Sequence, residues 1–342
     1  MSTATMPRLL AMALAMGLLA DASAKTWRHA AASGLNALIV RAQPGDTIRI
    51  AGTVAEGTIK LNKRLVLVGE ANAVVDGGGR GDVIIVSADS VTVKGLTVRG
   101  AQHGNLEDMA GIKVSNCRGA RLIGNTLERC FFAIYLNNAH GALIEGNQVN
   151  GDEADPDRMA NGIHLWKCDG ITIRGNRVHH HRDGIYLEFV TDSRIEGNTT
   201  WKNQRYGLHF MFSHRDVYER NRFEDNGAGV AVMFSHEITM LRNEFLSNLG
   251  GSAYGLLLKE INDARIERNV FADNTVGILV DGCNRAQVLD NAFRGNGWAV
   301  KLFANSTATV FERNNFTGNT FDMTTNGDLV LSELKGNYWD RY

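Results

Sequence analysis

Methionine and histidine side chains recur together in a tetrapeptide that the chain uses twice. Met211-Phe212-Ser213-His214 is followed 22 residues later by Met233-Phe234-Ser235-His236, and His209 lies two residues before Met211. Thioether and imidazole ligands together suit Cu(I), and imidazole also suits Cu(II). Zinc fits less well, because thioether is a poor zinc ligand and the chain has no cysteine cluster. The residues predict a copper site, while a repeat that copies residues, with methionine as a flexible contact surface, stays open as the alternative.

A repeat of about 22 residues determines where these side chains lie. A Gly/Arg-Asn-x-Val/Phe motif and a Gly-apolar-x-apolar motif run in phase along the chain. Short alternating segments such as Gly184-Ile185-Tyr186-Leu187 are typical of strands, and no segment has a convincing helical pattern. The sequence therefore predicts an all-β, right-handed parallel β-helix. The Asn of the first motif falls at positions 125, 147, 176, 198, 221, 243, 269, 291, 314 and 337.

One domain is expected over residues 25–342. Residues 25–95 would form less regular N-terminal coils and a cap, and residues 96–342 the regular coils. A second Asn ladder follows five residues after the first, from Asn203 onward. Both ladders are interpreted as structural, because inward Asn at a turn can satisfy backbone groups of neighbouring coils.

Alternation along the strands predicts which residues face outward in the middle coils. Successive coils place His209 and Met211 in the same columns as His164, Trp166, Tyr186 and Glu188. Two loop insertions at one corner add Met109 and Met159 to a secondary or partner-contact face. The candidate metal ligands are thus Met211, His214, Met233, His236 and His209. The candidate contact residues are His164, Trp166, Tyr186, Glu188, Met109 and Met159.

The run His179-His180-His181 before Asp183 is a weaker hint of metal or proton handling. His181 occupies a position of the second Asn ladder, so it is expected to point inward or into the turn. His179 and His180 are each more often solvated turn residues.

Carbohydrate chemistry is the main alternative, since carboxylates a few ångströms apart hydrolyse glycosidic bonds. Asp169, Asp183, Glu188 and Asp192 lie near the same face, with Arg205 and Tyr206, and Trp166 could stack on sugars. No carboxylate pair repeats in one column, and no Asp cluster suggests a Ca²⁺-assisted lyase. A passive adhesin on the same fold is a third possibility.

The composition and the N-terminal segment limit the possible partners and the cellular location of the protein. With Lys plus Arg at 36 and Asp plus Glu at 37, the net charge of −1 argues against a nucleic-acid binder. Arg8, the apolar run 9–20 and Ala22-Ser23-Ala24 predict a secretory signal peptide over residues 1–24. No later apolar run is long enough to span a membrane. The spacing of Cys117, Cys130, Cys168 and Cys283 predicts four buried free thiols.

The chain resembles the NosD family of periplasmic maturation factors of nitrous oxide reductase. The resemblance rests on Leu65-Val66-Leu67-Val68-Gly69-Glu70, Val75-Asp76-Gly77, Arg205-Tyr206-Gly207-Leu208-His209-Phe210-Met211, Gly229-Val230-Ala231-Val232-Met233-Phe234-Ser235 and Gly336-Asn337-Tyr338-Trp339. The two central blocks are the most specific. One departure bears on the transporter contact: the chain stops at Tyr342, where family members usually continue.

The resemblance implies a non-enzymatic periplasmic protein that takes part in copper delivery. Its partners would be an ABC-type transporter made of a membrane subunit and a cytoplasmic ATPase, a copper chaperone lipoprotein, and nitrous oxide reductase, whose copper–sulfur site is assembled. By the same resemblance, His209, Met211, His214, Met233 and His236 become copper-handling or partner-contact residues. The chain itself has no GxxxxGK loop for ATP.

Overall fold

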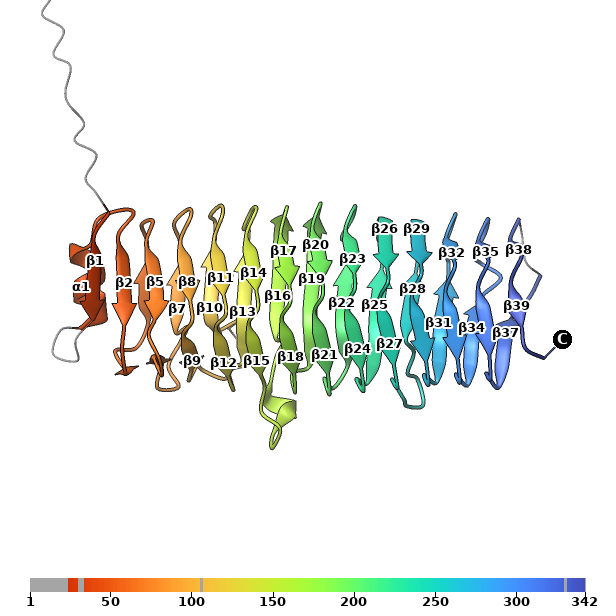
Figure 1. Ribbon diagram of the computed structural model, residues 1–342, viewed down its shortest axis with the longest axis horizontal. Coiled ribbons are helices and arrows are strands. Elements are labelled where there is room, and N and C mark those ends of the chain that lie inside the picture. The colour runs from red at the N-terminus through yellow and green to blue at the C-terminus, as the bar shows by residue number, and fades with distance from the viewer. Residues whose placement is uncertain (1–23, 30–33, 105–106, 329–330, 342) are drawn as a thin grey trace, which may run out of the picture.

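The computed structural model describes residues 24–29, 34–104, 107–328 and 331–341. The predicted signal peptide lies outside the described residues, apart from Ala24. The chain winds into a parallel β-solenoid of about 13 turns with about 23 residues per turn. Figure 1 shows the coils stacked in chain order along one long axis. The predicted parallel β-helix is confirmed.

Each full coil contributes one strand to each of three parallel sheets, which we call A, B and C. Sheet A holds β1 (Thr26–His29), β2 (Thr47–Ile50), β5 (Val66–Gly69), β8 (Thr92–Lys94), β11 (Arg121–Ile123), β14 (Leu143–Glu145), β17 (Thr172–Arg174), β20 (Arg194–Glu196), β23 (Val217–Glu219), β26 (His236–Leu241), β29 (Asn262–Glu267), β32 (Gln287–Leu289), β35 (Val310–Glu312) and β38 (Glu333–Lys335).

Sheet B holds β3 (Thr53–Val54), β6 (Val74–Asp76), β9 (Thr97–Arg99), β12 (Thr126–Glu128), β15 (Gln148–Asn150), β18 (Arg177–His179), β21 (Thr199–Trp201), β24 (Arg222–Glu224), β27 (Glu244–Leu246), β30 (Val270–Ala272), β33 (Ala292–Arg294), β36 (Asn315–Thr317) and β39 (Tyr338–Trp339). Sheet C holds β4 (Ile59–Leu61), β7 (Ile84–Val86), β10 (Ala110–Ser115), β13 (Phe132–Asn137), β16 (Ile163–Asp169), β19 (Asp183–Thr191), β22 (Tyr206–Met211), β25 (Ala228–Met233), β28 (Leu256–Lys259), β31 (Val276–Asp281), β34 (Trp298–Leu302) and β37 (Phe321–Thr325).

The interior is a continuous core of stacked side chains, bordered by the Asn ladders. In each ladder, one Asn side-chain oxygen accepts hydrogen bonds from the backbone and side-chain amides of the preceding ladder Asn. Asn198 does this for Asn176 at 2.9 Å from both nitrogens, and its own amide donates to the Ile173 carbonyl. The ladder therefore satisfies buried turn groups of successive coils, as predicted.

A short helix, α1 (Leu35–Arg41), covers the N-terminal end of the solenoid. The expectation that no segment is helical is wrong here. Leu35, Leu38 and Ile39 are buried at the three- and four-residue spacing of one helical face. This face packs on the open end of the core, which a further coil would otherwise cover, so a seven-residue amphipathic segment is stabilised by tertiary contacts.

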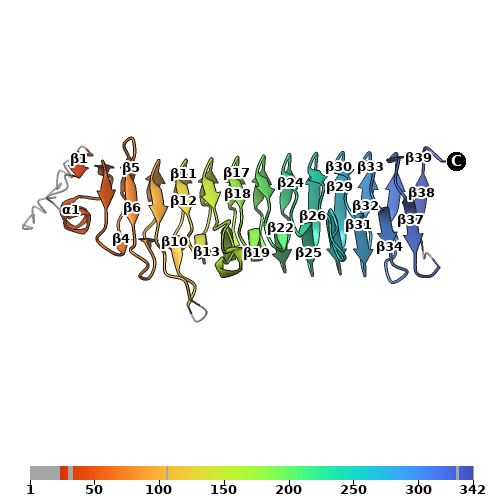
Figure 2. The same cartoon turned by 90° about the horizontal axis from the view of Figure 1, so that it is seen from below.

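Three insertions leave the solenoid at the same corner, between sheet B and sheet C. They follow β9, β15 and β27, and the second contains the 3₁₀ turn η1 (Pro156–Arg158). Figure 1 shows the second and third protruding on one side, and Figure 2 shows the first. In the part of the chain that the structure describes, no helix is long and apolar enough to cross a membrane.

Candidate functional site

The strand register predicted from the repeat is confirmed in sheet C. Met211 pairs with Met233 across β22 and β25, and Glu188 of β19 pairs with Met211. Trp166 pairs with Glu188 one coil earlier. The two methionines therefore occupy one outward column on neighbouring strands, and both side chains are partly exposed.

Tyr186 links this column to the next one. Its hydroxyl lies 3.4 Å from a carboxylate oxygen of Glu188 and 3.9 Å from the sulfur of Met211. Burial and the Glu188 charge raise the pKa of Tyr186 to about 12, so the hydroxyl keeps its proton at neutral pH. The Met211 thioether thus sits beside a proton donor and a carboxylate.

The second predicted pair, His214 and His236, forms a parallel stack with ring centroids 3.9 Å apart. The backbone N–H of His236 donates to Nδ1 of His214 at 3.2 Å, which places the proton of a neutral His214 on Nε2. Burial and the neighbouring His236 lower the pKa of His214. Nδ1 of His236 lies 3.2 Å from a carboxylate oxygen of Glu237, which favours an N–H there and leaves Nε2 as a lone pair.

The two imidazoles are therefore not equivalent. His236 has the carboxylate–histidine arrangement that orients metal-binding imidazoles, with Nε2 free to coordinate. His214 would need to move its proton before it could act as a ligand. In the hydrogen bonds and ring contacts of the described residues, nothing joins the histidine pair directly to the methionine pair.

Between the methionine and histidine columns lies a ladder of phenylalanines that the sequence reasoning missed. Phe189, Phe212 and Phe234 stack with ring centroids 5.3 and 5.2 Å apart. All three have left-handed backbones, with φ of 55°, 49° and 54°. Phe189 and Phe212 are exposed at 43% and 37%. The repeated tetrapeptide already contains Phe212 and Phe234 in register, so their stacking could have been predicted from the repeat.

His209 lies in its predicted column but does not present itself to solvent. It is only 6% exposed, with Tyr186 and Tyr206 packed against its ring. Its Nδ1 lies 3.7 Å from Asp183, whose carboxylate is bound at both oxygens by Arg205. His209 therefore belongs to a buried polar cluster one column away from the Met211 sulfur.

The predicted contact residues divide into accessible and covered ones. His164 stacks between Tyr135 and Tyr186 at 4.8 Å from each, and burial lowers its pKa to about 3. Trp166 and Met109 are partly exposed, whereas Met159 is 3% exposed under its own loop. Met159 therefore does not offer its sulfur to a partner in this conformation.

The four cysteines are free and buried, as predicted. Burial raises the pKa of Cys117 and Cys168 to about 11 and of Cys130 and Cys283 to about 12. They remain protonated thiols and are poor metal ligands. Among the described residues, no group of three or more His, Cys, Asp or Glu side chains could hold a metal ion. A site for copper therefore depends on the thioethers.

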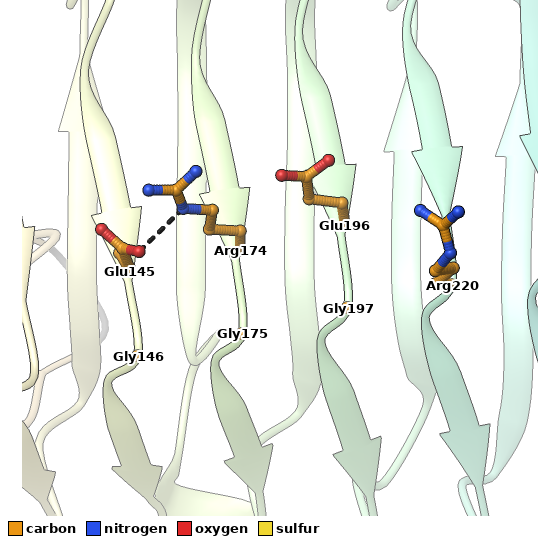
Figure 3. Close-up of a pocket in the computed structure, with 7 residues that line it drawn as sticks. All are labelled: Glu145, Gly146, Arg174, Gly175, Glu196, Gly197 and Arg220. Atoms are coloured by element: carbon orange, nitrogen blue, oxygen red, sulfur yellow. Dashed lines mark hydrogen bonds and ion pairs between the residues drawn. The ribbon is translucent and has the colours of Figure 1, made fainter.

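The hollow drawn in Figure 3 lies on a different corner, where sheet A meets sheet B. Its floor is the glycine run Gly146, Gly175 and Gly197, and charged side chains of β14, β17 and β20 line it. Arg174 there binds Glu145 at 2.8 Å. It contains neither methionine nor histidine, so the hollow has no donor set for copper.

The comparisons with known proteins point to the same metal, copper, as the methionine and histidine side chains. The family model described as "Periplasmic copper-binding protein (NosD)" matches residues 81–205 and 145–342. A "Probable ABC transporter binding protein NosD" of Pseudomonas aeruginosa is 29% identical over 323 residues, which cover 80% of this chain and 72% of that protein. The Stutzerimonas stutzeri protein of the same name is 26% identical over 132 residues, which cover 38% of this chain and 30% of that protein.

Solved structures with the same fold include carbohydrate-active enzymes and a surface adhesin of Streptococcus pneumoniae, all at low sequence identity. The catalytic domain of a GH87 alpha-1,3-glucanase has a TM-score of 0.66 at 10% identity, covering 92% of this chain and 69% of that one. The periplasmic alginate epimerase AlgG has a TM-score of 0.57 at 13% identity, covering 90% and 82%. These likenesses show the fold alone. The family match covers most of the coils, and the chain belongs to the NosD family.

Proposed function

We propose that this protein is a non-catalytic periplasmic accessory protein that holds Cu(I) transiently and passes it on. The observation that carries the proposal is the in-register pair Met211 and Met233 beside the stacked pair His214 and His236. The family description, a periplasmic copper-binding protein, supports the same cargo.

The donor set suits an ion that must be released. Two thioethers and the free Nε2 of His236 are soft and borderline ligands, which Cu(I) accepts. Because Phe212 and Phe234 separate the methionine and histidine columns, we propose that these side chains converge only when the ion binds. No thiolate competes, since the cysteines are buried and protonated. His214 supports the site by stacking on His236 and accepting its backbone N–H. Without thiolates, the expected binding is exchangeable.

Delivery requires a partner whose ligands approach the same place. Any such partner must cover the exposed phenylalanine ladder, because it separates the methionine and histidine columns. The name of the Pseudomonas aeruginosa relative supports association with an ABC transporter. We propose a membrane subunit with its ATPase as that transporter, a lipoprotein chaperone as the copper donor, and nitrous oxide reductase, with its copper–sulfur site, as the recipient.

The test is anaerobic Cu(I) competition with a chromophoric chelator. The parent protein should take one copper per chain. A variant with Met211, His214, Met233 and His236 all changed to Ala should take none, while its circular dichroism stays that of the parent. Equal copper binding by both proteins, or none by the parent, would contradict the proposed site.

The polysaccharide-active alternative is supported by the shared fold and by two carboxylates of β19, Asp183 and Glu188. Asp183, however, is fully buried and bound by Arg205 at both carboxylate oxygens, which lowers its pKa against the effect of burial. Such a group is held as an anion and is badly placed to donate a proton. Turnover of a uronate polymer that disappears in Asp183→Asn or Glu188→Gln would favour the enzyme instead.

A further inference from the structure

Two adjacent histidines at the insertion corner, one coil after the second insertion, point their ring nitrogens at each other. His179 ends β18, and His180 follows it with a left-handed backbone, φ 55°. Because a strand residue and a following left-handed residue project to the same side, both rings leave the coil together. Nδ1 of His179 lies 2.6 Å from Nδ1 of His180.

The surroundings fix the orientation of both rings. Nε2 of His180 lies 3.8 Å from a carboxylate oxygen of Glu153, which favours an N–H at Nε2 and a lone pair at Nδ1. The ring of His179 rests on the indole of Trp201 with centroids 4.4 Å apart.

The second insertion is built to lie close to this pair. The Gly151 backbone N–H donates to the His179 carbonyl at 2.9 Å. A Cβ on Gly151 would lie 1.8 Å from the His180 carbonyl oxygen, so only glycine allows the loop to reach Glu153 across the histidines.

From this geometry we infer that His179 and His180 form a second metal site, one for a divalent cation such as Zn²⁺ or Cu²⁺. Both Nδ1 atoms are the ligands, and Glu153 orients His180 from outside the coordination shell. On binding, the N–H···N hydrogen bond between the two Nδ1 atoms opens and the rings move apart, because ligands with Zn–N bonds of about 2.0–2.1 Å lie farther apart than 2.6 Å in a tetrahedral site. The Nδ1 proton of His179 is replaced by one at its Nε2 through exchange with water, so no net proton is lost. The remaining positions belong to water, which makes the site open and exchangeable.

This site differs from the proposed copper site in chemistry as well as in place. It has two imidazoles and no thioether, and therefore favours borderline divalent ions over Cu(I). Arg177, which lies over the Trp201 ring, and nearby Lys202 add positive charge that limits the affinity.

Calorimetric titration with Zn²⁺ tests the inference, since thioethers bind zinc poorly. The parent should bind one zinc, and His179→Gln/His180→Asn should bind at least about tenfold more weakly. Asn is chosen at position 180 because it tolerates the left-handed backbone. A control variant, His214→Gln/His236→Gln, should keep the zinc. Equal zinc affinity in the parent and the first variant, or no zinc bound by the parent, would overturn the site.

A local readout keeps the test valid if the double variant does not fold. Cu²⁺ should quench the fluorescence of Trp201 in the parent, and this quenched component should be absent in Trp201→Phe. Glu153→Gln, a change on an exposed loop, should shift the quenching midpoint about tenfold upward. An unchanged midpoint in Glu153→Gln together with quenching that persists in Trp201→Phe would contradict the site.

Discussion

The middle coils of sheet C and the coils on either side share one backbone and differ in what they display. At the corner that follows the sheet C strands, Asn138, Lys167, Glu260 and Gly282 adopt φ of 50°, 52°, 53° and 67° in the coils on either side. Phe189, Phe212 and Phe234 adopt the same conformation in the middle coils. Asn and Gly enter this region cheaply, whereas a bulky residue costs about 1 to 2 kcal/mol.

The fold therefore does not require phenylalanine at this corner, because Asn, Lys, Glu and Gly adopt the same conformation there in other coils. Strain of this kind is retained where the surface has a task. The same coils carry the methionine and histidine pairs, while the outer coils at those positions carry residues such as Lys259 and Asp281. A backbone that is the same in every coil therefore carries the methionine and histidine pairs in its middle coils.

The largest expected effect on stability tests whether the Asn ladder supports the middle coils and the outer coils equally. Asn198→Ala in a middle coil and Asn291→Ala in an outer coil each leave a backbone amide and a carbonyl buried without partners. Each should lower the free energy of unfolding by roughly 2 to 6 kcal/mol. Urea denaturation measures this, with Thr199→Ala as a control of small effect. Clearly different losses at the two sites would show that the frame is not uniform.

A pH dependence should single out the middle region. Asp216 is fully buried, and burial raises its pKa to about 8. The neighbouring coils have Ser193 and Ile238 at this position. Since the folded state holds a proton that the unfolded chain releases above its ordinary pKa near 4, the contribution of Asp216 to stability should be lost as pH rises through the window from about 4 to 8. The slope is about 1.4 kcal/mol per pH unit.

Urea midpoints of the parent and of Asp216→Asn measured across that window isolate this contribution, and the stability of the parent relative to the variant should fall as the pH rises. Asp183 works in the opposite direction, because Arg205 lowers its pKa despite burial. Its contribution to stability is present above the ordinary Asp pKa and is lost only as the pH falls below it. Buried His164, His179 and His181, whose pKa values burial lowers, add stability as the pH rises to about 6.5, so the parent curve alone does not test Asp216. A stability difference between parent and Asp216→Asn that stays constant from about pH 4 to 8 would contradict the assignment of Asp216.

The two histidines of the middle coils should differ although the repeat makes them look alike. His236→Ala removes the free Nε2 ligand and should weaken Cu(I) binding by about tenfold or more. His214→Ala should cost less, since its Nδ1 is already occupied by the His236 backbone. Competition with a Cu(I) chelator ranks the two. A larger loss for His214→Ala would mean that the tautomers are assigned the wrong way round.

The smallest effect concerns the strained corner itself. Phe212→Asn should leave the urea midpoint unchanged or raise the stability by about 1 kcal/mol, because Asn relieves the left-handed strain. The same change should slow copper transfer to a partner without changing Cu(I) affinity. Asn138→Ala in an outer coil is the matched control and should affect neither transfer nor affinity. Loss of stability in Phe212→Asn would show that the ladder serves the fold.

The repeat determines which features of the structure the sequence can predict. The register of Met211 with Met233 and the inward Asn ladders follow from counting residues, because each coil repeats the same geometry. Burial and side-chain direction at the corners cannot be predicted by counting residues in the repeat. His209 is covered by Tyr186 of the neighbouring strand and by Tyr206 of its own strand. Phe212 is exposed because its backbone is left-handed, and the residue type alone does not predict this. Helix α1 depends on tertiary packing and was missed for the same reason.

X-ray absorption spectroscopy on the Cu(I)-loaded protein tests the central claim most directly. Copper held by Met211, Met233 and His236 predicts two sulfur neighbours and one nitrogen neighbour. In Met211→Leu/Met233→Leu, which keeps the side-chain volume, the sulfur shell should disappear. A shell of nitrogen and oxygen alone in the parent, or a sulfur shell that persists in the variant, would contradict the account.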